Sequence, residues 1–151
     1  MLQVKLEAKS GSKLSGSAML MEVEGGVKVT LSVEGVTPPG DRGAHVHEKG
    51  DCSSGDGMST GGHFNPDAKP HGPQVGPHHG GDMPSLSADA NGNAQTSFTL
   101  DEVTVAAGPK SVVGKGLIVH KDPDDYATQP TGNSGARIAC GVIKRDPTPG
   151  N

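Results

Sequence analysis

Six of the seven histidines in this chain, together with an aspartate, stand at spacings that suit a site for two metal ions. They occur in five short stretches, namely His45–Val46–His47, His63–Phe64–Asn65–Pro66, His71, His79–Gly80–Gly81–Asp82 and Val119–His120. If one imidazole is shared, this set supplies a four-nitrogen site beside a site of three nitrogens and one oxygen. Four nitrogens in tetragonal geometry suit Cu(II), and a tetrahedral nitrogen and oxygen set suits zinc. A single histidine is more simply explained as a hydrogen-bonded loop residue, but that explanation does not account for His78 being the only spare histidine.

The elements that must position these ligands have the two-residue period of half-buried antiparallel strands. Alternation is strict over residues 27–34 and recurs at residues 4–8, with shorter β-rich runs at 96–100 and 117–120. His45 and His47 therefore project from one face of a strand, while Val46 points to the core. Asn91–Gly92 predicts a tight hairpin. No segment has helical periodicity, so we predict an all-β fold: a Greek-key β-sandwich or flattened barrel with no helix longer than about two turns.

Two long segments interrupt the strand pattern. Residues 48–85 are rich in Gly, Pro, Asp and His, and they carry candidate metal ligands and a cysteine. Loops of that length are usually functional or disordered, and we expect metal bonds to order this one. Residues 121–135 are polar and charged, and their simplest interpretation is a solvated surface loop.

Composition fits one domain over residues 1–151 with a mainly aliphatic core, because the chain has only two Phe, one Tyr and no Trp. The net charge is −4 and there is no basic run, so we expect no nucleic acid and no membrane surface among the partners. No apolar stretch has the length of a membrane span.

The two cysteines, Cys52 and Cys140, lie far apart and form no CxxC motif. Such a pair is typical of a structural disulfide and of an oxidising compartment, although two unrelated buried thiols remain an alternative. Met1 is followed by an alternating polar pattern without the apolar region of a signal peptide, which indicates either a cytosolic protein or a mature chain. We expect a periplasmic or otherwise extracytoplasmic mature protein.

The residues around the histidines resemble those of copper/zinc superoxide dismutases. The similar segments are residues 43–48, 61–66, 80–82, 119–120 and 132–143, and the resemblance extends from about Val4 to Ile143. The bacterial branch is indicated by Cys52 directly after Gly50–Asp51 and by residues 78–84 and 124–130. The resemblance also implies an intrachain disulfide between Cys52 and Cys140.

The resemblance implies an enzyme that converts superoxide into oxygen and hydrogen peroxide by cycling copper between Cu(II) and Cu(I). The ligands it implies are His45, His47, His63 and His120 for copper, and His63, His71, His79 and Asp82 for zinc. His63 would bridge the metals as an imidazolate, release copper on reduction and take up a proton that helps form peroxide. His79 is chosen over His78 because it lies three residues before Asp82, as in the family motif.

Two further residues match family positions. Asp124, four residues after His120, matches a carboxylate that hydrogen-bonds one histidine of each metal site, here His45 and His71. Arg137 matches the arginine beside the copper, which would bind the superoxide anion by charge and hydrogen bonds. From the sequence alone, the simpler interpretations are a surface acid and a strand-edge arginine.

Some features depart from the family or stay open. The loop between Asp124 and Arg137 is shorter than in eukaryotic members, so other cations would have to steer superoxide. Four lysines could do this and cannot be ranked from the sequence: Lys49, Lys69, Lys115 and Lys121. Bacterial members occur as monomers and as dimers, and we expect a homodimer here.

Two other functions are alternatives to a dismutase. A non-catalytic copper buffer or chaperone of the same fold would be indicated by loss of a copper ligand or of the arginine, and neither is lost. A binuclear zinc hydrolase commonly carries HxHxDH on an α/β scaffold, whereas here Glu48–Lys49 follows His47 and the pattern is all-β.

Overall fold

The computed structural model describes residues 2–24, 26–36, 40–65, 71–72, 78–83, 86–101, 103–105, 108–124, 126 and 135–145. Within them the chain is built from strands, and one three-residue 3₁₀ helix is the sole helical element of these segments. The elements are β1 (Leu2–Ala8), β2 (Ser15–Val23), β3 (Gly26–Glu34), β4 (Gly40–Arg42), β5 (Ala44–His47), η1 (Met58–Thr60), β6 (Leu86–Ala88), β7 (Ala94–Leu100), β8 (Gly116–His120), β9 (Arg137–Val142) and β10 (Lys144–Arg145).

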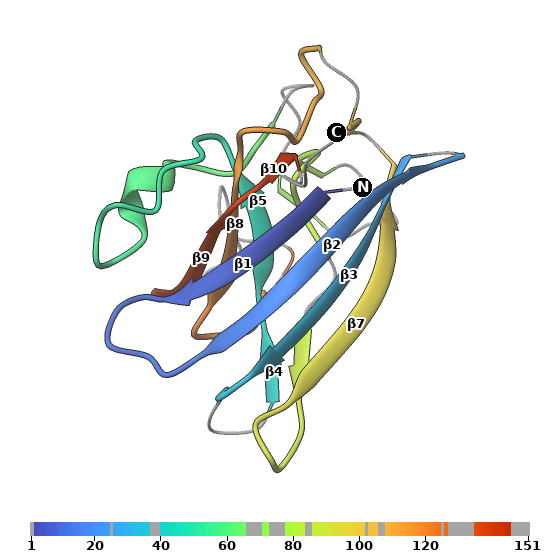
Figure 1. Cartoon of the computed structure of the whole chain (residues 1–151). Helices are drawn as coiled ribbons and strands as arrows, with labels where there is room; N and C mark the ends of the chain where they lie inside the picture. Colours follow the sequence, from blue (N-terminus) through green and yellow to red (C-terminus); the bar gives the residue numbers. More distant parts are fainter. Residues whose placement is uncertain are drawn as a thin grey trace.

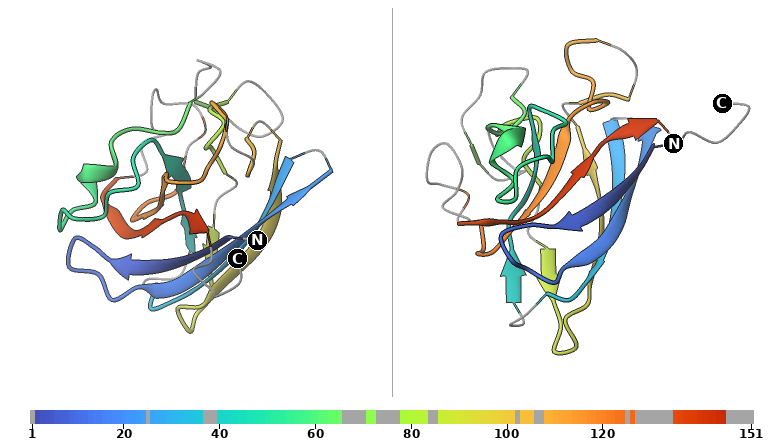
Figure 2. Two further views of the ribbon diagram at one scale, coloured as in Figure 1. Left: turned by 45° about the horizontal axis from the view of Figure 1, so that its top comes forward. Right: turned by 60° about the vertical axis from the view of Figure 1, so that its left-hand side comes forward.

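An eight-stranded antiparallel sheet curls around the core (Figure 1). Its order is β5-β8-β9-β1-β2-β3-β7, with β10 beside β1, while β4 and β6 form a separate pair. The strands β5, β8 and β9 face β2, β3 and β7 across the interior (Figure 2). The crossovers that place β9 beside β1 and β8 beside β5 confirm the predicted all-β, Greek-key type of fold.

The core forms because alternate side chains of each strand turn inward. In β1 the buried residues are Leu2, Val4 and Leu6, and in β3 every second residue from Val27 to Val33 is buried. Each fully buried aliphatic side chain of this kind contributes about 1.5–3 kcal/mol. As predicted, the core is aliphatic, with Phe64 as its buried aromatic among the described residues.

The Asn91–Gly92 turn forms as predicted, but the strands that it joins do not pair. Gly92 has a φ of 79° and its N–H donates to Asp89 O over 3.0 Å, while Asp89 N donates to Asn93 O over 2.9 Å. The preceding strand β6 pairs with β4 instead, and β7 pairs with β3. The hairpin prediction is wrong on this point because β6 closes one end of the fold rather than extending the large sheet.

The loop between β5 and β6 spans the predicted interval and is fixed to the sheet by covalent and polar contacts. Cys52 and Cys140 form a disulfide with a sequence separation of 88, so the predicted bond is confirmed. The turn after β1 adds two hydrogen bonds, from Lys9 Nζ to Cys52 O and from Ser10 N to Gly55 O. The described residues include no helix with the length and apolar character needed to cross a bilayer.

Candidate metal centre

The backbone of β5 organises the candidate site by binding both arms of the long loop. Val46 donates to Gly81 O over 2.8 Å, Phe64 donates to Val46 O over 2.7 Å, and Gly81 donates to Phe64 O over 2.8 Å. A Cβ on Gly81 would lie 2.4 Å from Val46 O, so this close approach requires glycine. The three bonds bring His63 beside His47 of the strand.

Four buried imidazoles converge at the first metal-binding group. One ring nitrogen from each lies within 4.8 Å of the others, and the residues are His45, His47, His63 and His120. The inward atoms are His45 Nδ1, His47 Nε2, His63 Nε2 and His120 Nε2, and none of the four has a hydrogen-bond partner. Buried polar atoms are normally paired, so four such nitrogens aimed at one point fit a metal ion.

The outer nitrogen of these rings is hydrogen-bonded, which fixes how each ring is turned. His47 Nδ1 donates to Gly61 O over 2.9 Å, and His120 Nδ1 donates to Gly135 O over 3.1 Å. His45 Nε2 lies 2.8 Å from Asp124 Oδ2. Such contacts leave the opposite nitrogen as an unprotonated donor to a metal.

A second group lies on the other side of the His63 ring. His63 Nδ1 is 2.9 Å from Asp82 Oδ1 and 3.2 Å from His79 Nδ1. Asp82 Oδ1 is also 2.9 Å from His71 Nδ1 and 3.4 Å from His79 Nδ1. A tetrahedral zinc site with bonds of about 2.0–2.1 Å separates its ligand atoms by about 3.3 Å, which is close to these four distances.

His63 faces both groups, with Nε2 toward the first and Nδ1 toward the second. Around this point, the donors that all fall within 4.8 Å of one another are those of His45, His63, His71 and Asp82, a set that does not include His79. We favour His79 because the partnerless nitrogen of His45 already belongs to the first group and its other nitrogen contacts Asp124.

Asp124 links the two groups. Its Oδ1 lies 2.7 Å from His71 Nε2, its Oδ2 contacts His45, and Tyr126 N donates to Oδ1 over 2.7 Å. Burial raises the pKa of Asp124, but the hydrogen bonds from His45 and His71 outweigh burial and hold that pKa well below its usual range. The residue is therefore a fixed anion that orients one ring of each group.

Burial keeps the first group neutral. It lowers the pKa of His45 to about 3 and that of His120 to about 4, and it lowers the pKa values of His47 and His63 as well. Neutral imidazole is the form that binds metal, so His45, His47 and His120 can bind a metal ion near pH 7 without first losing a proton.

Arg137 begins β9 and pairs with His120 at an irregularity in the sheet. Arg137 is 8% exposed, and its Nη1 donates to Gly57 O over 3.2 Å and to Thr60 Oγ1 over 3.0 Å. Its pairing with His120 places it beside the first group, where its charge adds to the burial that lowers the pKa values of His47 and His120. No motif or spacing in the sequence indicates Thr60 as a neighbour of this arginine.

His78 lies in neither group. It is buried, its Nδ1 donates to His79 O over 2.6 Å, and its Nε2 lies 3.6 Å from Asp101 Oδ1. Its contacts tie the loop to the end of β7.

The four lysines that could steer superoxide lie in different places in the structure. Lys49 and Lys115 line a hollow of about 440 Å³ that reaches His63, and Lys115 Nζ lies 5.0 Å from the centroid of the Phe64 ring. Lys121 lines a different hollow, and Lys69 falls outside the described residues. Of the four lysines, Lys49 and Lys115 are therefore the two that share a hollow with His63, and Glu48 lines the same hollow.

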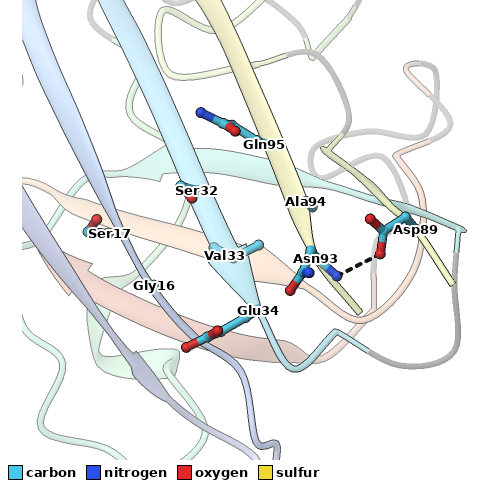
Figure 3. A pocket seen from close by; sticks show the side chains of 9 residues that line it. All are labelled: Gly16, Ser17, Ser32, Val33, Glu34, Asp89, Asn93, Ala94 and Gln95. Atoms are coloured by element: carbon cyan, nitrogen blue, oxygen red, sulfur yellow. Dashed lines mark hydrogen bonds between the residues drawn. The ribbon is translucent and has the colours of Figure 1, made fainter. Parts of the chain in front are cut away.

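A further hollow, of about 540 Å³, lies where β2 and β7 begin and β3 ends (Figure 3). Its charged lining residues are Glu34 and Asp89, and no histidine lines it. Such a lining repels anions and lacks metal-binding nitrogens, so the chemistry of the chain is expected at the histidines.

Comparison with known proteins agrees with this geometry. The family model for copper/zinc superoxide dismutase matches residues 14–143. Two copper-zinc superoxide dismutases of Aquifex aeolicus (strain VF5) are 41% and 40% identical, covering 85% and 90% of this chain and 78% and 83% of the relatives. A crystal structure of an SOD-like protein from Bacillus subtilis has a TM-score of 0.84 at 33% identity and covers 93% of this chain and 97% of that chain. This chain is accordingly a member of the copper/zinc superoxide dismutase family.

Proposed function

We propose that the chain is a superoxide dismutase in which His45, His47, His63 and His120 hold copper. Zinc is held by His63, His71, His79 and Asp82, so that His63 is shared. One observation supports the proposal above all: four buried imidazole nitrogens without partners lie close together, and the second nitrogen of the His63 ring faces Asp82 and His79. The donors fit a tetragonal copper site beside a tetrahedral zinc site.

Bound copper would supply the electron transfer that oxidises one superoxide to oxygen and reduces the next to peroxide. Arg137 is placed to bind the substrate anion beside the first group by charge and hydrogen bonding. His63 would take up a proton at Nε2 during one half-reaction and deliver it to the peroxide in the other. Asp82 and the histidines on the other side of the ring hold His63 in position meanwhile.

The test is superoxide turnover by protein whose copper and zinc contents have been measured. Turnover should scale with copper occupancy of the first group. Fully loaded protein without turnover would favour the non-catalytic metal-binding alternative, and ester or phosphoester hydrolysis with zinc alone would favour the hydrolase.

We further propose that the chain is one domain and works in the periplasm or another extracytoplasmic compartment. The described core residues form one hydrophobic cluster, which supports a single folding unit. The Cys52–Cys140 disulfide supports an oxidising compartment.

We expect a homodimer in solution. Met19 and Met21 are each 40% exposed on one face of β2, and Met58 is 58% exposed in the loop, so the described surface offers apolar atoms but no aromatic cluster. Sedimentation at micromolar concentration should give twice the mass of the 15.2 kDa chain. A single species of monomer mass would contradict this prediction.

Asp124→Asn should weaken zinc binding by about 10–100-fold, because an amide cannot hold the His45 and His71 rings by charge. Asp82→Ala should lower zinc affinity and stability while leaving part of the copper-dependent activity, since Asp82 belongs to the second group of donors and not to the first. Zinc affinities can be measured by competition with a chelator of known affinity. Unchanged zinc affinity in Asp124→Asn would remove the proposed role of that residue.

Zinc uptake should depend on pH through His71. Burial lowers the pKa of His71, but hydrogen bonds to Asp124 and Asp82 outweigh burial and raise that pKa to about 9. In the metal-free protein His71 is therefore protonated near pH 7, and zinc must displace that proton. Apparent zinc affinity should rise about tenfold per pH unit until about pH 9. Calorimetry in buffers of different ionisation enthalpy measures this proton, and zinc uptake without proton release near pH 7 would contradict the prediction.

A further inference from the structure

We infer that Thr60 is a positioning residue for Arg137, an inference that rests on the proposed function. Thr60 is the last residue of η1, is 0% exposed, and lies 77 residues from Arg137 in the sequence. Its hydroxyl oxygen lies 3.0 Å from Arg137 Nη1. The hydroxyl holds the guanidinium in the orientation in which it meets the anionic substrate.

The direction of each hydrogen bond follows from the groups involved. Thr60 Oγ1 donates its one proton to Gly57 O over 2.8 Å, and it must therefore accept from Arg137, which has only donors. Arg137 Nη1 also donates to Gly57 O over 3.2 Å. Both protons of Nη1 thus have acceptors in the loop, and the remaining donors of the guanidinium fork are left for an anion.

Packing fixes the Thr60 side chain so that its hydroxyl can do this. A Cβ added to Gly116 of β8 would lie 2.8 Å from Thr60 Cγ2, so the methyl group rests on that glycine. The Thr60 carbonyl accepts from Lys49 N over 3.0 Å. Because threonine is stiff at χ1, holding the methyl group also sets the direction of the hydroxyl.

A glycine, Gly57, lets the loop approach Arg137 closely. Gly57 has a φ of 74°, and a Cβ there would lie 3.0 Å from Arg137 Cβ. The conformation that brings Gly57 O and Thr60 Oγ1 to one nitrogen is therefore open to glycine and strained for other residues.

The test compares Thr60→Val, which removes the hydroxyl and keeps the shape, with Thr60→Ser, which keeps the hydroxyl. Ser59→Ala is the matched control, since Ser59 Oγ donates to Asp51 O over 2.6 Å and bonds Ser54 but does not contact Arg137. In the metal-free protein, nitrogen NMR should show slowed guanidinium rotation of Arg137 in the parent, Thr60→Ser and Ser59→Ala. Rotation should become fast in Thr60→Val, and unchanged rotation there would overturn the inference.

With both metals bound, Thr60→Val should lower kcat/KM for superoxide by about three- to tenfold, because a displaced guanidinium orients the anion less well. The same substitution made in an Arg137→Ala background should have no further effect. An equal loss in both backgrounds would show that Thr60 acts by another route. A parent protein that is loaded but inactive would refute the proposed function instead, and the NMR comparison would still decide the role of Thr60.

Discussion

Arg137→Ala should keep both metals and lose about one to two decades of kcat/KM for superoxide, because it removes the positive charge that we propose attracts and binds the substrate anion. The residue contacts Gly57 and Thr60 rather than any inward-facing ligand nitrogen, so metal affinity should be little affected. Arg137→Lys should be intermediate, since it keeps the charge and loses the planar fork. Pulse radiolysis with measured metal contents would give the rates.

Salt provides the control for this first prediction. Screening weakens long-range attraction, so added salt should slow the parent more than Arg137→Ala. Equal salt dependence in the two proteins would show that Arg137 adds nothing to the attractive field, and full activity in Arg137→Ala would remove it from the site.

Removing the disulfide should lower the free energy of unfolding by roughly 4–5 kcal/mol, as the chain-entropy model gives for a closed loop of this length. The bond joins Cys52 to Cys140 across a separation of 88. The paired Cys52→Ser and Cys140→Ser variant should be compared with the parent by denaturant unfolding, both metal-free, because bound metal adds its own stabilisation.

Thiol titration checks the premise of that experiment. The parent, denatured without reductant, should show no free thiol. Two titratable thiols would contradict the disulfide in the protein as prepared, and equal unfolding free energies in parent and variant would contradict its contribution to stability.

Much of the site follows from local rules that a sequence exposes. The one-residue spacing of His45 and His47 places both on one face of β5, and the composition of residues 48–85 marks a functional loop. The structure brings the donors of His45, His47, His63 and His120 together, and those of His71 and Asp82 lie beside them. His79 lies next to His63 and Asp82, and Asp124 contacts His45 and His71.

Contacts between segments far apart in the chain could not be predicted in the same way. The turn at Asn91–Gly92 was visible, but the pairing of β6 with β4 depends on where the long loop returns to the sheet. Thr60 contacts Arg137 in a loop that is tied to β9 by the disulfide and that turns at Gly57, a glycine with positive φ. The spacing of residues in the sequence does not indicate this contact. Lys49 and Lys115 could be distinguished from the other lysines only once Phe64 and His63 had been placed.

The hydrogen bonds between the loop and Val46 have a consequence for solubility. Strand β5 is an edge of the eight-stranded sheet, and an open edge offers unpaired backbone groups to another molecule. Here the loop occupies that edge: Gly81 and Phe64 bond Val46, and bridges pair His45 with Asp82 and His47 with His63. The loop that carries the candidate metal donors thus also protects the edge strand β5 from pairing with other molecules. Metal bonds would hold this loop in place, so we expect the protein without its metals to be the form most exposed to intermolecular strand pairing.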